Sequence, residues 1–210
     1  MTRILLISGS TQEGSLHTAA LRTAARFAPA GITATLFDGL RALPAFVPGE
    51  RISPGAVALL RHRVDAADAV LFSTPEYAGS LPGSLKNLLD WLADDAALEG
   101  KPVAWLSVAA PGQDDGARAM LETVLAHGNA RVLRPACIRI PLHPDAVDAE
   151  GIVTDPRLHL ALLDQLQALA RSLAVPEPRQ PPSWQAYSSL YPVVQARPDT
   201  SVFRKWRAPG

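Results

Sequence analysis

The strongest constraint on the fold is a regular alternation between short, continuous apolar runs and longer segments with helical periodicity. Residues 4–7 (ILLI) and 69–72 (AVLF) contain no polar side chain, as is typical of strands that are buried on both faces. Similar reasoning predicts strands at 4–7, 33–37, 69–72, 103–108 and 132–140, the last interrupted by Pro135, and helices at 18–27, 54–67, 82–92, 117–127 and 156–173. Alternating strands and helices predict an α/β domain: an open, doubly wound, five-stranded parallel sheet in a three-layer α/β/α arrangement.

In such a sheet, ligands bind beyond the carboxyl ends of the strands, where the strand order reverses. Three loops are therefore candidates for a binding site, at residues 8–17, 73–81 and 107–116. The first, SGSTQEGSLH, places serines and glycines directly before a helix, where free backbone N–H groups suit a phosphate monoester. It has neither the Gly-x-Gly-x-x-Gly pattern of dinucleotide sites nor the Gly-Lys-Ser/Thr of a P-loop. The alternative interpretation is a capping loop that binds no ligand.

Charge and cysteine content exclude several other classes of protein. The formal net charge is zero, so nucleic acid and anionic membrane surfaces are not expected as partners. Cys137 is the sole cysteine, so no intrachain disulfide can form. No apolar run approaches the roughly 20 residues that span a bilayer. The chain begins directly with a strand rather than a leader, and we therefore expect a cytoplasmic protein with no membrane association.

Three segments resemble one known family in order and spacing. GSTQEGSLH, STPEYAGSLPGSLKNLLDW and LEGKPVAWLS are similar to the NADPH-dependent FMN reductases, a flavodoxin-like group that includes quinone, azo-dye and chromate reductases. The resemblance covers residues 3–173. It implies a flavodoxin-like fold, FMN as cofactor, NAD(P)H as co-substrate, and hydride transfer to a flavin, quinone or similar small acceptor in a homodimer or homotetramer.

The resemblance also implies which residues contact the cofactor. In the family, the loop at residues 75–79 lies along the flavin ring. Together the loops and the resemblance predict a cofactor site made of Ser8, Ser10, Gln12, Ser15, His17, Pro75, Glu76, Tyr77, Ala78, Gly79, Ser107 and Gly112. FMN itself carries out the chemistry in this family, so no side chain is expected to be catalytic. No metal is expected either, because His127, His143 and His159 lie on different elements without ligand spacing.

Three residues depart from the family pattern within these loops. Gln12 stands where an arginine is usual, which removes a charge-assisted contact to the phosphate and predicts weaker binding. His17 stands where an asparagine is usual, and either donates to the phosphate or is an ordinary helix-start residue. Ala78 also replaces a common asparagine. These departures keep a flavin-free binding or scaffold protein open as an alternative, whereas zero net charge disfavours an electron-carrier flavodoxin.

Charged residues near the loops also have ordinary structural interpretations. We expect Asp114 and Asp115 to cap the helix that follows them and to face water rather than the flavin. We expect Lys86 and Asp90, with Asn87, to form a solvated helix face with pairing at i, i+4.

A C-terminal arm follows the domain of residues 1–175. Residues 176–210 hold seven of the 19 prolines and five of the 12 aromatic residues of the chain, with no helical or strand period. Proline density is typical of a disordered tail, which usually lacks aromatics. We expect instead an ordered, extended arm that anchors its aromatic side chains on a partner subunit.

Overall fold

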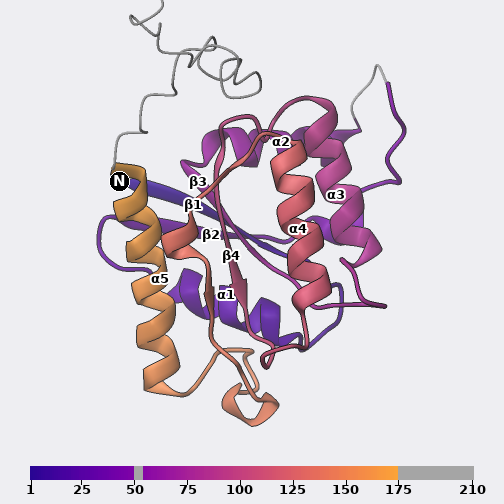
Figure 1. The fold of residues 1–210 in the computed structure, drawn as a ribbon. Helices are drawn as coiled ribbons and strands as arrows, with labels where there is room; N and C mark the ends of the chain where they lie inside the picture. Colours follow the sequence, from indigo (N-terminus) through magenta and orange to yellow (C-terminus); the bar gives the residue numbers. More distant parts are fainter. Residues whose placement is uncertain (50–53, 175–210) are drawn as a thin grey trace, which may run out of the picture. The chain divides into compact units, whose positions relative to one another are not determined.

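The computed structural model describes residues 1–49 and 54–174. They form three layers, with a parallel sheet between two layers of helices (Figure 1). The strands are β1 (Thr2–Ser8), β2 (Ile32–Phe37), β3 (Ala69–Ser73), β4 (Pro102–Ser107), β5 (Arg131–Val132) and β6 (Ile138–Arg139). Their order is β2-β1-β3-β4-β5, with β6 also paired to β4, and every pairing is parallel. The predicted doubly wound α/β fold is confirmed.

Helices cover both faces of the sheet. They are α1 (Leu16–Arg26), α2 (Gly55–Ala66), α3 (Gly83–Asp94), α4 (Asp115–His127) and α5 (Pro156–Ala174), with short 3₁₀ turns η1 (Leu40–Ala42), η2 (Arg134–Ala136) and η3 (Pro144–Ala146). Ile4 and Leu6 of β1 pack in one core with α1 and α5, whereas Leu5 and Ile7 pack in a second core with α2, α3 and α4. Burial on both faces explains why the strand reads as an unbroken apolar run.

Helix α3 fits its predicted pattern except at one residue. Its apolar face is fully buried, and Lys86 pairs with Asp90 at 2.6 Å, as predicted for an i, i+4 pair. Asn87 is instead a structural residue: its Oδ1 accepts the N–H of Phe46 (2.7 Å) and its Nδ2 donates to the Pro44 carbonyl (2.8 Å). The side-chain amide thus holds a loop against the helix, in place of the predicted solvated position.

The last predicted strand, at 132–140, is divided in two. Pro135 lies in η2, between β5, which pairs with the start of β4, and β6, which pairs with its end. Proline has no N–H to donate to a ladder, so the strand breaks there and resumes. Because β6 is also parallel, its carboxyl end brings residues 141–144 to the edge of the sheet where the three candidate loops lie.

The C-terminal arm predicted at 176–210 lies outside the described residues. Among the helices at 1–49 and 54–174, none combines the length and apolar character needed to cross a membrane.

Candidate functional site

A cleft of ≈ 890 Å³ lies at the carboxyl edge of the sheet and collects residues from four loops. Its lining residues are Ser10, Gln12, Gly14, Ser15, Leu16, His17, Pro75, Tyr77, Val108, Ala109, Ala110, Gln113, Pro141, Leu142, His143 and Pro144. Six residues of the predicted cofactor site therefore line one cavity: Ser10, Gln12, Ser15, His17, Pro75 and Tyr77. These loops, at residues 10–17, 75–77, 108–113 and 141–144, meet because the parallel strands all end at this edge.

The loop between β1 and α1 is organised by its own serines. Ser8 Oγ accepts the N–H of Ser10 (3.3 Å), and Ser10 Oγ accepts the N–H of Gln12 (3.2 Å). Ala19 is the first residue of α1 whose N–H donates to a backbone carbonyl of the preceding turn, that of Ser15 (2.9 Å). The N–H groups of the preceding residues at the helix start are thus available to a ligand, and they carry the positive end of the helix dipole. This donor set fits a phosphate monoester.

Ser8 is a largely buried residue that supports this loop through hydrogen bonds. It is only 6% exposed, and its hydroxyl lies 2.8 Å from Thr18 Oγ1. It does not line this cleft, but it lines the cavity on the other side of the loop, and its predicted contact with the cofactor stays a prediction.

The loop after β3 contains a tight turn at the rim of the cleft. Tyr77 and Ser80 exchange backbone hydrogen bonds of 2.9 and 3.1 Å, and the two residues between them have positive φ, 51° at Ala78 and 73° at Gly79. This is a type I′ turn, which asparagine and glycine adopt readily, whereas alanine in the left-handed region costs about 1–2 kcal/mol. The usual asparagine of the family at position 78 therefore has a conformational reason. Ala78 and Gly79 shape the turn and do not themselves line the cavity.

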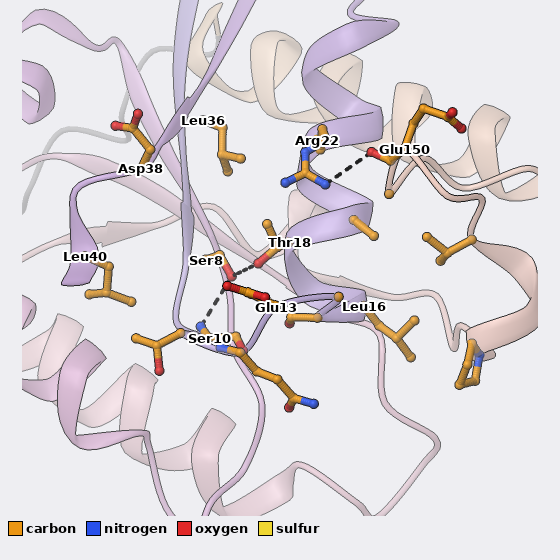
Figure 2. Close-up of a pocket in the computed structure, with 18 of the residues that line it drawn as sticks. Ser8, Ser10, Glu13, Leu16, Thr18, Arg22, Leu36, Asp38, Leu40 and Glu150 are labelled. Atoms are coloured by element: carbon orange, nitrogen blue, oxygen red, sulfur yellow. Dashed lines mark hydrogen bonds between the residues drawn. The ribbon is translucent and has the colours of Figure 1, made fainter.

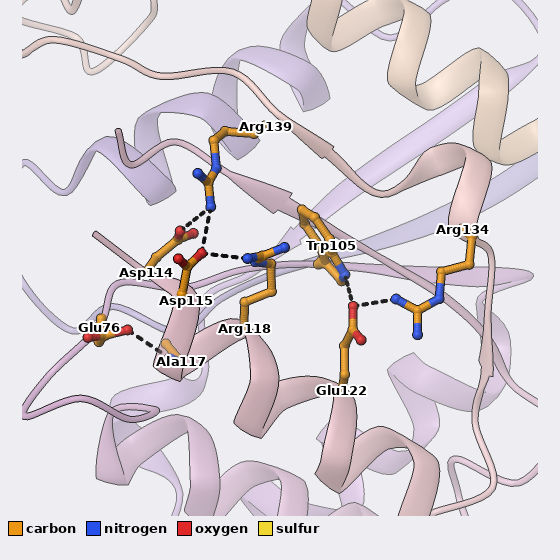
Figure 3. A network of polar contacts seen from close by, with 9 residues as sticks. All are labelled: Glu76, Trp105, Asp114, Asp115, Ala117, Arg118, Glu122, Arg134 and Arg139. Atoms are coloured by element: carbon orange, nitrogen blue, oxygen red, sulfur yellow. Dashed lines mark hydrogen bonds and ion pairs between the residues drawn. The ribbon is translucent and has the colours of Figure 1, made fainter. Parts of the chain in front are cut away.

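Glu76, another residue of the predicted site, does not line the cleft and instead binds the start of α4. Its Oε2 accepts the N–H of Ala117 in the first turn of α4 at 2.9 Å (Figure 3). A carboxylate at this helix end satisfies a donor that has no intrahelical partner and interacts favourably with the helix dipole. Glu76 thus fastens the loop after β3, which we call the ring loop (residues 75–79), to α4.

The loop after β4 also lines the cleft, mostly with small residues. Val108, Ala109, Ala110 and Gln113 contribute, while Gly112 between them is exposed and outside the lining. Ser107 is 2% exposed and lies outside the lining too; within 1–49 and 54–174 its hydroxyl has no hydrogen-bond partner. Ser107 and Gly112 are thus next to residues that line the cleft, and their contact with a cofactor stays a prediction.

The expectation that Asp114 faces water was wrong. Asp114 is 3% exposed and pairs with Arg139 at 2.6 Å, because β6 brings that arginine beside the start of α4 (Figure 3). Asp115 is exposed and pairs with Arg118 (2.5 Å) and Arg139 (3.2 Å), whose guanidinium groups hold the pKa of its carboxyl below the usual value. Neither carboxylate lines the cleft.

His17 is the one predicted site residue that is both buried and titratable. It is 7% exposed, and its Nδ1 lies 2.9 Å from Ser73 Oγ at the end of β3. Burial lowers the pKa of the imidazole to about 4, although the nearby Asp114 carboxylate opposes this shift. The side chain is therefore neutral near pH 7 and offers no positive charge to a phosphate.

A second cavity, of ≈ 570 Å³, lies along the same loop between α1, the end of β2 and the turn at 147–151 (Figure 2). Arg22 reaches into it from α1, and Arg41 donates to the Thr11 carbonyl at its edge. Its lining includes four acidic residues, Glu13, Asp38, Asp148 and Glu150. Its carboxylates outnumber its guanidinium groups, which disfavours an anionic ligand in this cavity.

The segment after β6 was missed by sequence reasoning. Pro141, Leu142, His143 and Pro144 line the cleft, yet no candidate residue was placed there. The signal was present: the strand at 132–140 was predicted as parallel, so its carboxyl end had to lie at the same edge as the other loops.

Comparison with known proteins agrees with this geometry. The family model described as NADPH-dependent FMN reductase matches residues 2–142. The chain is 35% identical over 175 residues to an NAD(P)H-dependent FMN reductase of Pseudomonas aeruginosa, covering 80% of this chain and 92% of that one. It is 33% identical over 138 residues to a quinone reductase of Escherichia coli, covering 62% of this chain and 73% of that one. A solved flavoenzyme, the NAD(P)H:(acceptor) oxidoreductase FerB of Paracoccus denitrificans, superposes with a TM-score of 0.70 at 27% identity, covering 83% of this chain and 98% of that one.

Proposed function

Because the chain belongs to the NADPH-dependent FMN reductase family, we propose that the cleft holds FMN and that the protein transfers hydride from NAD(P)H to a small acceptor. One observation carries this proposal: two loops meet in one cavity. They are the loop before α1, which we call the serine loop (residues 8–15), and the ring loop after β3. The first offers backbone donors to a phosphate, and the second places the side chains of Pro75 and Tyr77 on the lining, as suits an aromatic ring system such as isoalloxazine.

The chain's own residues have binding and positioning roles in this function. Ser10, Ser15 and the N–H groups at the start of α1 would hold the phosphate, while Pro75 and Tyr77 would flank the ring. Glu76 keeps the ring loop in place through Ala117. FMN, when bound, supplies the group that accepts and passes on hydride, so no general acid or base is required of the protein.

The acceptor is a flavin, quinone or similar small molecule, in keeping with the relatives named FMN reductase and quinone reductase. A homo-oligomer stays a prediction.

We expect the purified protein to bind FMN more tightly than FAD. The donor set before α1 suits a terminal phosphate, and the adjoining cavity presents four acidic residues against Arg22 and Arg41, which disfavours the adenylate half of FAD. Titration by quenching of flavin fluorescence measures both affinities. Tighter binding of FAD would overturn the preference, and no quenching by either flavin would favour the flavin-free scaffold.

Gln12→Arg should tighten FMN binding by about tenfold. A guanidinium at this lining position adds a bidentate, charge-assisted contact to the phosphate, worth about 1.4 kcal/mol or more beyond a neutral hydrogen bond. Riboflavin, which lacks the phosphate, is the matched control and should bind the variant and the wild type equally. An equal gain for both flavins, or no gain for FMN, would show that position 12 does not reach the phosphate.

A further inference from the structure

His17 connects the two loops that are proposed to hold the phosphate and the flavin ring. It follows the serine loop in sequence, and its ring contacts Ser73, the last residue of the strand that leads into the ring loop. We propose that His17 presents an unprotonated Nε2 to the cleft and that this nitrogen accepts a hydrogen bond from a ribityl hydroxyl of FMN. The inference rests on the proposed function, since it concerns the same cleft.

The tautomer of His17 follows from the hydrogen bonds of Ser73. Ser73 Oγ donates its one proton to the Leu106 carbonyl, at 2.8 Å. At 2.9 Å from His17 Nδ1, the same oxygen can therefore act only as an acceptor. Nδ1 must carry the proton of that hydrogen bond.

The other ring nitrogen is then an acceptor. Burial keeps the imidazole neutral by lowering its pKa to about 4, so a ring protonated on Nδ1 has a lone pair on Nε2. Within residues 1–49 and 54–174, Nε2 has no hydrogen-bond partner. Protein atoms do not enclose it completely, so another molecule can reach it. Since His17 lines the cleft, the partner of Nε2 is a molecule that enters it.

An unprotonated Nε2 can bind only a part of the cofactor that donates a hydrogen bond. A phosphate monoester near neutral pH offers mainly acceptor oxygens, which an unprotonated nitrogen repels. The ribityl chain, by contrast, carries hydroxyl donors and joins the phosphate to the ring, as His17 joins the serine loop to the ring loop. This assignment differs from both interpretations of His17 that the sequence left open, a donor to the phosphate and an ordinary helix-start residue.

Three flavins that differ in one part each provide the test. Lumiflavin has the ring alone, riboflavin adds the ribityl chain, and FMN adds the phosphate. His17→Phe, which keeps a flat ring without nitrogen, should weaken riboflavin and FMN by the same factor of about three to ten, and leave lumiflavin unchanged. His17→Asn, whose amide oxygen can accept, should restore part of the loss. A loss for FMN only would make His17 a phosphate ligand, and a loss for all three would make it a ring contact; either result, or no loss, overturns the proposal.

The tautomer is measurable without any flavin. In the ¹⁵N spectrum of histidine-labelled protein, His17 should show a protonated Nδ1 and an unprotonated Nε2, and Ser73→Ala should let the two tautomers mix. An Nε2-protonated ring in the wild type would overturn the proposal even if His17→Phe did not fold. Failure of the wild type to bind any of the three flavins would instead refute the proposed function.

Discussion

Arg139→Ala should lower the free energy of unfolding by about 3–5 kcal/mol, because it leaves a buried carboxylate without its counter-ion. Asp114 has a side chain that is 4% exposed, and Arg139 donates to it at 2.6 Å. The arginine comes from β6, so the ion pair also fastens this short strand to the start of α4. Chemical denaturation monitored by circular dichroism gives the free energy directly.

Two further variants make the result interpretable. Arg134→Ala breaks the pair with Glu122 at 2.5 Å in the same network, but Arg134 is 64% exposed, so we expect a loss of about 1 kcal/mol or less. Asp114→Ala combined with Arg139→Ala removes both charges and should recover part of the stability of the single Arg139 variant, since Asp114 makes no side-chain cap to α4. Equal effects of Arg139→Ala and Arg134→Ala would show that water reaches Asp114.

The fold was predictable because its signals are local. Residues 4–7 read as a strand buried on both faces, and β1 has Leu6 and Ile7 fully buried against helices on opposite sides. The break at Pro135 was visible for the same reason: a missing N–H depends on one residue and not on its distant neighbours. Periodicity and the chemistry of proline thus predicted the strands, the helices and the break in the last strand.

The roles of the loop carboxylates were not predictable, because each depends on a partner far away in the sequence. Glu76 accepts from a backbone N–H 41 residues later, and Asp114 pairs with an arginine 25 residues later. A carboxylate in a turn-rich segment ordinarily faces water, and only the packing of α4 against the ring loop and β6 removes these two from it. The sequence therefore indicated which loops meet, whereas which side chains of those loops line the cavity depends on these distant partners.

Gly116→Ala should weaken FMN binding at least tenfold, because α4 and the ring loop touch at this residue. A Cβ at position 116 would overlap the carbonyl oxygen of Gly79 and lie 3.0 Å from Glu76 Oε2. The obstacle is backbone and not the end of a flexible side chain, so the ring loop has to move away from the helix. Overpacking of this kind costs about 1–3 kcal/mol, and the same shift lengthens the hydrogen bond from Ala117 to Glu76.

The displaced loop is the one proposed to lie along the flavin ring, so the affinities of lumiflavin, riboflavin and FMN should all fall together. That pattern separates the Gly116 variant from changes at His17, which should spare lumiflavin. Gly55→Ala is the matched control. Gly55 is also at the start of a helix, α2, but a Cβ there meets no atom of residues 1–49 or 54–174 within 4 Å, so neither flavin affinity nor the melting temperature should drop. If Gly116→Ala bound all three flavins as tightly as Gly55→Ala does, the contact between α4 and the ring loop would have no part in holding the flavin, and the role assigned to Glu76 would fail with it.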